Sequence, residues 1–391
     1  MTVGPVASID QINEALADRL EDLLPELIGG RAHKGEWIAA STEEGGLGDS
    51  LGVHLRGAKR GKWYHFAAGV GGDPLGLINY ARFGNVDMKR AFAWARDFLG
   101  GKIEPETEKA RELRLKRQAA LRQKEERDEQ KRRGQARWHF LFDPKTVEDW
   151  RGTPAWHYLN NRLGGRLDQL GHLPGSIRFH QALYNGQLST KERPIELPAM
   201  IAAVVNADGE MVALHRTWLV KRGAGDDSWD RLREEDLAAY AGRTSDGRAL
   251  KGKKVLGGYR GATIRLWAGY RVHSKTGEVK MGVQWPRLAK GSSIMLAEGI
   301  ETGLSLALAM RERRIVSTIS VDGFADVVLP PCFSHVTVAA DRDPDNKATA
   351  AAIERAKAAH AGAGRHCTVV YPPEGIDDWN TALKEVAGRV A

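Results

Sequence analysis

The last hundred residues of the chain alternate between short apolar runs and helix-like segments, and this alternation constrains the fold more than any other feature. The apolar runs lie at 294–297, 315–321, 335–340 and 366–371, and helix-like segments lie at 301–313, at 346–361 and from 379 onward. Strands that alternate with helices at this spacing form a parallel sheet with helices on both faces. We therefore predict an α/β domain over residues 291–391.

Acidic residues follow two of these predicted strands. Glu298 comes directly after the first strand, and Asp341 and Asp343 come after the third. Sites on parallel sheets lie at the carboxyl ends of the strands, and residues two apart in an extended segment point to the same side. We therefore expect the three carboxylates to converge, and such a group needs a cation such as Mg²⁺ or Mn²⁺. The alternative is that Glu298 and Asp341 only cap the helices that follow them.

A third acidic spot follows the last predicted strand, where Asp377 and Asp378 precede the final helix. They either extend the metal site or cap that helix, and the sequence leaves both readings open.

The charge of the chain is divided unevenly along its length. The whole chain carries 58 Lys and Arg against 50 Asp and Glu, but residues 211–290 carry 17 against 8 and residues 291–391 carry 10 against 13. A basic segment beside an acidic metal site suits a polyphosphate substrate and a nucleic-acid backbone. Taken singly, each basic residue is better explained as a solvated surface charge, whereas the set favours phosphate contact. Our candidates are Arg216, Lys253, Lys254, Arg260 and Arg265.

The remaining chain divides into three parts. Residues 1–103 predict a small α+β module, with a first helix capped by Asp10, strands at 37–40, 50–55 and 62–66, and helices at 74–83 and 87–99. Residues 104–134 are charged and poor in large apolar residues, which favours an exposed helical linker. Residues 135–290 begin with helical segments around 138–141 and 155–163, and strands follow at 199–205, 211–215 and 262–266. The Asp208-Gly209 pair between the first two of these strands indicates a hairpin.

The motifs of the C-terminal domain resemble those of a known family. The segments 297–302, with Glu298, Gly299 and Glu301, 340–343, and 375–380 resemble, in this order, the Toprim domain shared by bacterial-type primases, topoisomerases and some nucleases. The resemblance implies that Glu298 acts as general base or acid beside the metal, and that Asp341 and Asp343 hold Mg²⁺. Replicative primases often have an Asp where this chain has Thr302, and whether the adjacent Glu301 replaces it stays open.

The segments 215–219, 253–258 and 261–266 resemble those that precede the Toprim part in phage-type and plasmid-type primases. The resemblance implies that residues 135–290 form the basic half of a polymerising cleft, which handles template and nucleotide.

The first hundred residues resemble the zinc-binding module at the front of such primases, over 61–66 and 69–78. The only cysteines are Cys332 and Cys367, so the module lacks the zinc ligands and we expect no zinc. His33, His54 and His65 lack the spacing to replace them. We expect Trp37, Trp63, Tyr64 and Phe66 to form the core. Alternatively, Lys62, Trp63 and Tyr64 contact single-stranded DNA, with the aromatic rings stacked on unpaired bases.

These features predict a DNA primase that makes short RNA primers on single-stranded DNA from nucleoside triphosphates with Mg²⁺. A Toprim-type nuclease and an inactive DNA-binding replication accessory are the alternatives. We expect a separate helicase, because the sequence has no P-loop motif. We expect a cytoplasmic protein, because the sequence has no signal segment and no run of 18 apolar residues. The resemblance to phage-type and plasmid-type primases implies a phage or mobile-element replication protein, while the sequence leaves plasmid, phage and chromosomal origin open.

Overall fold

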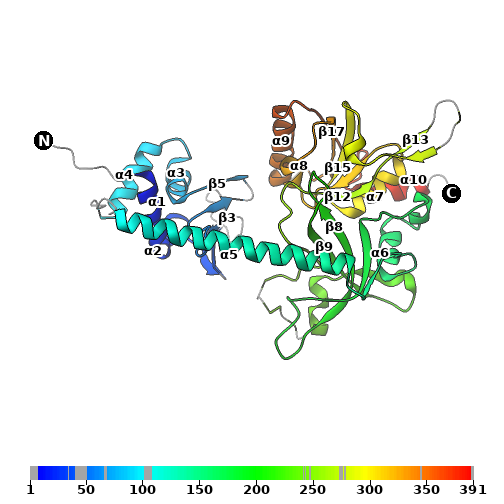
Figure 1. Ribbon diagram of the computed structural model, residues 1–391, viewed down its shortest axis with the longest axis horizontal. Coiled ribbons are helices and arrows are strands. Elements are labelled where there is room, and N and C mark those ends of the chain that lie inside the picture. The colour runs from blue at the N-terminus through cyan, green and yellow to red at the C-terminus, as the bar shows by residue number, and fades with distance from the viewer. Residues whose placement is uncertain are drawn as a thin grey trace. The chain divides into compact units, whose positions relative to one another are not determined.

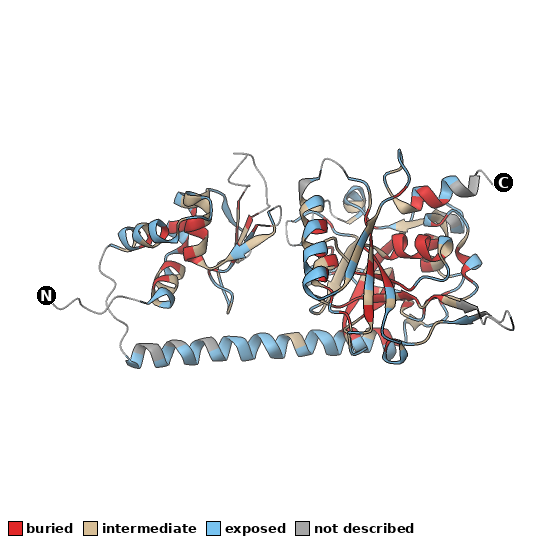
Figure 2. Ribbon diagram, turned by 90° about the horizontal axis from the view of Figure 1, so that it is seen from above, coloured by how far each residue is buried: buried red, intermediate tan, exposed pale blue. Residues whose placement is uncertain are grey.

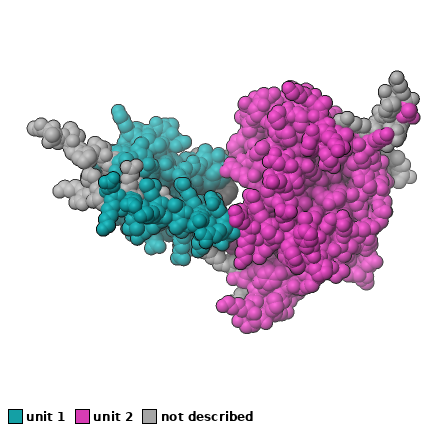
Figure 3. All heavy atoms as spheres, in the orientation of Figure 1, with its two compact units in different colours: residues 1–128 teal, residues 129–391 magenta. Residues whose placement is uncertain are grey.

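The computed structural model divides the chain into two compact units, Met1–Asp128 and Glu129–Ala391 (Figure 3). It describes residues 8–33, 35–39, 51–65, 68–100, 108–240, 242, 244–245, 248–272, 276, 279–343 and 346–388. No helix within these ranges is long and apolar enough to cross a membrane.

The first unit packs four helices against one antiparallel sheet. The sheet has the order β1-β2-β3-β4-β5, with β1 Arg31–His33, β2 Glu36–Ala39, β3 Leu51–His54, β4 Trp63–His65 and β5 Val70–Gly72. The helices are α1 Ile9–Asp18, α2 Leu20–Ile28, α3 Pro74–Phe83 and α4 Met88–Phe98. Trp37, Val53 and Trp63 are cross-strand neighbours and all are buried, so one face of the sheet forms the core with the helices.

Most predicted elements of this unit are confirmed, but its beginning is not as predicted. Ser8, rather than Asp10, caps the first helix and forms a capping box with Gln11. The expected single helix is divided at Arg19 into α1 and α2. Strands β1 and β5 were not predicted. Phe66, part of the predicted core, lies outside the described residues.

A single helix, α5 Glu108–Leu141, runs through the charged segment. Its described side chains are exposed over most of its length, as the pale blue ribbon in Figure 2 shows. The predicted exposed helix is confirmed, and it continues through Leu141, where we expected a separate segment.

The second unit begins with an antiparallel sheet in the order β10-β9-β8-β7-β6, and β11 also pairs with β9. Its strands are β6 Thr146–Val147, β7 Ile177–Tyr184, β8 Glu196–Val205, β9 Met211–Lys221, β10 Trp229–Arg231 and β11 Lys253–Leu256. The predicted hairpin is present, because β8 and β9 pair antiparallel and Gly209 takes a φ of 88° that favours glycine. Helix α6, Pro154–Arg162, packs against β8 and β10.

The C-terminal sheet has the order β12-β16-β15-β17-β18. Its strands are β12 Ile264–Trp267, β15 Ser292–Ala297, β16 Ile315–Ser317, β17 Phe333–Ala339 and β18 His366–Val370, and its helices are α7 Ile300–Ala309, α8 Gly323–Asp326, α9 Lys347–Gly362 and α10 Trp379–Gly388. A separate pair, β13 Tyr270–Val272 and β14 Val279–Met281, lies between β12 and β15 in sequence.

The predicted parallel arrangement is confirmed for β15, β16, β17 and β18, whereas β12 joins β16 antiparallel. The two faces of the sheet are buried in different cores. Met295 and Ala297 lie in the core that contains α7, and Leu296 and Val338 lie in the core that contains α8 and α9. Helices thus cover both faces (Figure 1), and the carboxyl ends of β15 and β17 lie side by side.

Candidate active site

Glu298 lies where β15 turns into α7. Ala297, the last residue of β15, pairs with Ser317 and with Ala339 on the neighbouring strands. The Ser317 hydroxyl donates to the backbone carbonyl of Glu298 at 2.7 Å. This contact fixes the turn and holds the Glu298 side chain at the carboxyl edge of the sheet.

Asp341 follows β17 on the adjacent strand, and the loop before α10 holds it in place. The Arg342 backbone N–H donates to the Asp377 carbonyl at 2.7 Å, and the Trp379 indole donates to the Ala340 carbonyl at 3.1 Å. Asp378 is thereby brought to the same edge of the sheet. Its Oδ1 accepts from the Thr381 N–H at 2.7 Å and caps α10.

These three acids line a cavity of about 300 Å³ in the second unit. The carboxylates come from the ends of β15 and β17 and from the loop before α10. The rest of the lining is mostly polar and is supplied by Tyr158, Arg162, His215, Arg231, Lys253, Gly299, Ile300, Glu301, Thr302, Ser317, Ile319 and Asn380.

The acids of the cavity repel one another. Burial, followed by the charge of Asp341, raises the pKa of Glu298. Burial, followed by the charge of Asp378, raises the pKa of Asp341 to about 6. Oδ1 of Asp341 is buried and has no hydrogen-bond partner among the residues that the structure describes. An unpartnered carboxylate oxygen beside two further carboxylates fits a hard divalent cation such as Mg²⁺ or Mn²⁺.

The structure does not bring every predicted acid into the cavity. Asp343 is exposed, and its Oδ2 accepts from the Asn346 amide at 2.8 Å. The structure therefore does not bring Asp343 together with Asp341, because Asp343 instead contacts Asn346, the residue that caps α9. Asp377 is exposed as well and also lies outside the cavity lining.

Glu301 also lines the cavity, but its carboxylate is paired with two neighbouring side chains. Its Oε1 accepts from the Lys253 ammonium at 2.7 Å and from the Tyr158 hydroxyl at 2.5 Å. Burial acts to raise the pKa of Glu301, but the charge and hydrogen bond of Lys253 and the hydrogen bond of Tyr158 hold that pKa well below its ordinary value. Glu301 is therefore a paired anion, which argues against its replacing the acid absent at Thr302.

Of the five basic candidates, only Lys253 lines the cavity. Arg216 stacks over the Trp218 ring at 5.0 Å, and burial lowers its pKa to about 10. Arg265 stacks over Trp285 and donates to the Asn206 carbonyl, so it supports the β8–β9 turn. Arg260 is largely exposed and pairs with Asp326 at 2.9 Å. Lys254 is partly exposed on β11.

Two arginines that the sequence did not single out line the cavity instead. Arg162 lies at the end of α6, outside the basic segment, and Arg231 ends β10. The charges of both act on the Tyr158 hydroxyl, so both guanidinium groups lie near it. Ile319 also lines the cavity with a φ of 75°, which is rare for a β-branched residue and is typical of strained functional sites.

In the first unit, the candidate stacking residues separate into buried and exposed ones. Trp63 is 5% exposed and donates to the Asp73 carbonyl at 2.9 Å, so it belongs to the core. Tyr64 points to the opposite face of the sheet and is 37% exposed, against our expectation that it packs in the core. Lys62 is exposed beside it. His65 is buried against the Tyr80 hydroxyl, and His54 faces Glu36.

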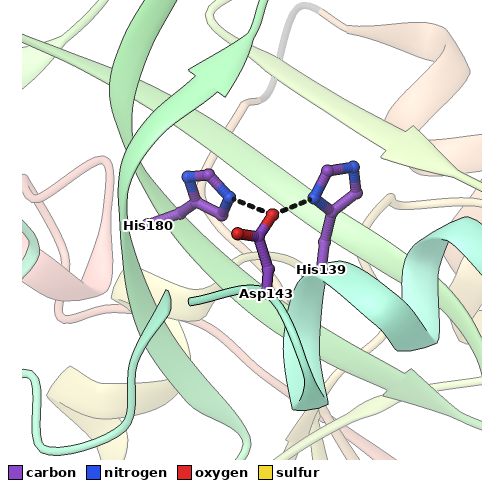
Figure 4. Close-up of side chains that lie close together, drawn as sticks. All are labelled: His139, Asp143 and His180. Atoms are coloured by element: carbon purple, nitrogen blue, oxygen red, sulfur yellow. Dashed lines mark hydrogen bonds and ion pairs between the residues drawn. The ribbon is translucent and has the colours of Figure 1, made fainter. Parts of the chain in front are cut away.

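A further group of possible metal ligands lies at the end of α5, where no sequence pattern predicts one. His139, Asp143 and His180 place ligand atoms within 4.8 Å of one another, and both rings point at Oδ2 of Asp143 from 2.9 Å (Figure 4). The Ala182 N–H donates to Nδ1 of His180, so the proton of the neutral ring is on Nε2 and donates to Asp143. The three side chains are therefore hydrogen-bonded without a metal, and they join α5 to β7. The carboxyl edge of the C-terminal sheet, with Glu298, Asp341 and Asp378, is the better candidate for a metal site.

Comparison with known families agrees with this geometry. Carboxylates at the ends of neighbouring parallel strands suit a divalent metal ion. Residues 293–388 match the Toprim domain, and residues 145–266 match a domain of unknown function, DUF7146. The C-terminal part of the chain is thus a Toprim domain, as its motifs predicted. No curated protein matches the chain in sequence.

Solved structures similar to the chain are primases. The zinc-binding and RNA polymerase domains of the Aquifex aeolicus primase share 13% identity over 99% of this chain and 84% of that chain, with a TM-score of 0.33. A DnaG primase catalytic domain bound to single-stranded DNA shares 13% identity over 66% and 77%, with a TM-score of 0.37. A DNA primase domain from Pseudomonas aeruginosa shares 14% identity over 53% and 55%, with a TM-score of 0.29. Likenesses this distant carry no information about activity.

Proposed function

We propose that the chain is a DNA primase, which uses Mg²⁺ to synthesise short RNA primers on single-stranded DNA from nucleoside triphosphates. The observation that carries the proposal is the cavity itself, whose lining contains three carboxylates besides the paired Glu301, and three cationic side chains. Glu298, Asp341 and Asp378 form the acidic wall, and Arg162, Arg231 and Lys253 form the basic wall. Carboxylates that can hold a metal, together with cations that line the same cavity, suit a triphosphate whose transfer develops negative charge.

The residues of the cavity have distinct roles in this proposal. Asp341 and Asp378 hold the metal, which when bound neutralises the phosphate oxygens of the incoming nucleotide. Glu298, whose pKa is raised, accepts the proton of the attacking hydroxyl. Arg162 and Arg231 hold the remaining phosphate oxygens. Asp343 and Asp377 are exposed and lie close in sequence to the cavity residues Asp341 and Asp378. They are candidates for holding a second ion that arrives with the nucleotide.

Template contacts lie further from the chemistry in this proposal. Lys254 and Arg260 are the remaining basic candidates of the second unit for the template backbone, and Tyr64 and Lys62 are those of the first unit. We place strand separation in a separate helicase, and the protein in the cytoplasm of a cell that carries the phage or mobile element.

A priming assay tests the proposal. The wild type is expected to make short labelled oligonucleotides from NTPs, Mg²⁺ and random single-stranded templates. Asp341→Asn removes a metal ligand while keeping the side-chain size, and we expect it to lower the rate at least a hundredfold. Asp208→Asn, at the exposed hairpin turn, is the matched control and keeps wild-type activity.

The same reactions distinguish the alternatives. Loss of template without added NTPs, in a metal-dependent and Asp341-dependent way, would identify a nuclease instead. Template binding that is independent of Mg²⁺, with neither synthesis nor cutting on any template, would identify an inactive replication accessory.

A further inference from the structure

A second pocket lies directly beside the carboxylate cavity. It has a volume of about 270 Å³ and is lined by Tyr158, Asn161, Arg162, Arg222, Ser228, Trp229 and Asp230. Tyr158 and Arg162 line both spaces. The two spaces therefore meet at the end of α6, and a ligand that reaches from one into the other passes Arg162.

Strand β10 also links the two spaces. Trp229 and Arg231 are two residues apart in this strand, so their side chains leave it on the same side. Trp229 lines the second pocket and Arg231 lines the carboxylate cavity. On the path from the second pocket into the carboxylate cavity, the side chains follow the order Trp229 indole, Arg231 guanidinium, then the carboxylates.

Most polar groups of the second pocket are already occupied by protein partners. Arg222 pairs with Asp236 at 3.0 Å and with Asp230 at 3.4 Å. Asp230 also pairs with Arg233, and the Ser228 hydroxyl donates to the Gly223 carbonyl. A phosphate finds no unpaired cation in this pocket apart from Arg162 at its border. The half-buried indole of Trp229 is the surface that it offers to a ligand.

We propose that this pocket holds the base of the nucleoside triphosphate, stacked on Trp229, while its phosphates lie between Arg162, Arg231 and the carboxylates. A nucleotide has the same order of parts as the path, namely a flat ring, then phosphates, then the bound metal. Because most hydrogen-bonding groups of the pocket are committed to other protein groups, the stack accepts all four bases with similar affinity. The inference rests on the proposed function, since it assigns the substrate of that site.

Equilibrium binding to the full-length protein with Mg²⁺ tests the inference, with each of the four NTPs and inorganic tripolyphosphate as probes. Trp229→Leu keeps apolar bulk but removes the aromatic face, and we expect it to weaken binding of every NTP about tenfold or more. It leaves tripolyphosphate binding unchanged, because that probe has no base. Trp229→Phe restores most of the NTP affinity. Arg162→Met weakens both kinds of probe, and the exposed-site control Trp138→Leu weakens neither.

The results separate the inference from the proposed function. If the wild type binds NTPs and makes primers while Trp229→Leu binds NTPs equally well, or loses NTPs and tripolyphosphate to the same extent, the base subsite is wrong and the primase stands. If NTP binding depends on Trp229 but no template supports synthesis, the subsite stands and the primase is wrong. If the wild type binds no NTP, both are wrong.

Trp229 also packs against the main core of the second unit, so its variants lose core packing as well as the aromatic face. A measurement on the wild type is therefore needed in addition. Photocrosslinking with 8-azido-ATP places the reactive group on the base itself. We expect the adduct in residues 226–231 or 154–162. An adduct confined to any other segment would overturn the subsite.

Discussion

Two carboxylates of the candidate active site, the buried Glu301 and the half-buried Asp341, show how partners decide what an acid can do. Glu301 accepts from Lys253 and Tyr158, and its pKa is held well below the ordinary value. Asp341 has an unpartnered oxygen, and burial beside Asp378 raises its pKa to about 6. Glu301 therefore stabilises the fold at neutral pH, whereas the ionised Asp341 destabilises it.

His215, on β9 and lining the cavity, makes stability depend on pH. Burial, followed by the charge of Lys253, lowers its pKa from 6.5 to about 4. As pH falls from 6.5 towards 4, this histidine is protonated in the unfolded chain but not in the folded chain. The free energy of unfolding therefore decreases over this range. His215→Gln removes this penalty. Between pH 7.5 and 5, we expect the variant to lose about 2 kcal/mol less stability than the wild type in urea unfolding.

Comparing His215→Gln with the wild type isolates the effect of His215, because both proteins contain Asp341, which changes stability with pH in the opposite direction. Its raised pKa means that the folded chain gains stability as pH falls towards 4. The exposed His335→Gln is the matched control and keeps the wild-type pH dependence. Equal pH dependence in His215→Gln and wild type would show that His215 is not buried as the structure has it.

At the scale of elements, the Lys253–Glu301 pair joins strand β11 of the basic half to helix α7 of the Toprim domain. Removing one partner of a buried pair leaves the other charge unpaired. We expect Lys253→Met to cost about 3 kcal/mol, and the double variant Lys253→Met with Glu301→Gln to cost less than the sum of the single changes, by about 1–3 kcal/mol. Urea unfolding at pH 7.5 measures the four members of this cycle.

The exposed pair Arg260–Asp326 is the matched control for the cycle. Arg260 is 85% exposed, so we expect a coupling below about 1 kcal/mol in its own cycle. Equal coupling in the two cycles would contradict the assignment of Glu301 as the buried anchor of Lys253.

Elements that depend on local pattern could be predicted from the sequence, and contacts between distant segments could not. Helix α3 and strands β15 and β17 follow directly from apolar periodicity and their Gly and Asp boundaries. The antiparallel pairing of β12 with β16 depends on residues about fifty positions apart, which no local pattern encodes. The break at Arg19 was missed because the apolar pattern continues across it.

The same distinction holds for the site. Glu298 and Asp341 could be predicted because their strands are neighbours in a parallel sheet. Arg162 could not, since its approach to the cavity depends on how α6 packs against β10. Charge content predicts a phosphate contact for Arg216, but it does not reveal that this side chain lies buried over the Trp218 indole.

At the scale of the whole molecule, the division of charge found in the sequence corresponds to two walls of one cavity. Arg231 and Lys253 come from the segment with 17 basic and 8 acidic residues, and Glu298 and Asp341 come from the acidic segment. Both walls belong to the second unit, so the proposed chemistry needs no residue of the first unit. The first unit then has a separable task, which we assign to the template.

Tyr64 is the residue of the first unit best placed for that task. Its cross-strand neighbours are Gly52 and Gly71, and a Cβ at Gly71 would lie 2.7 Å from the Tyr64 ring. The ring therefore lies across a glycine, and 37% of the residue stays exposed beside Lys62. An aromatic face next to a cation on an open sheet is typical of single-strand binding.

Tyr64→Ala is accordingly expected to weaken binding of a single-stranded oligonucleotide about fivefold or more, because one base stack is lost. In Tyr64→Ala, the slope of log affinity against log salt concentration stays the same, since no phosphate contact is removed. In Lys62→Ala, this slope becomes shallower by about one, which corresponds to one lost phosphate contact. NTP binding is unchanged in both variants, because the nucleotide site lies in the other unit. Fluorescence anisotropy over a salt series measures these effects, with the exposed Tyr184→Ala of the second unit as the matched control. Wild-type DNA affinity in Tyr64→Ala, or an equal loss in Tyr184→Ala, would assign the template to the second unit alone.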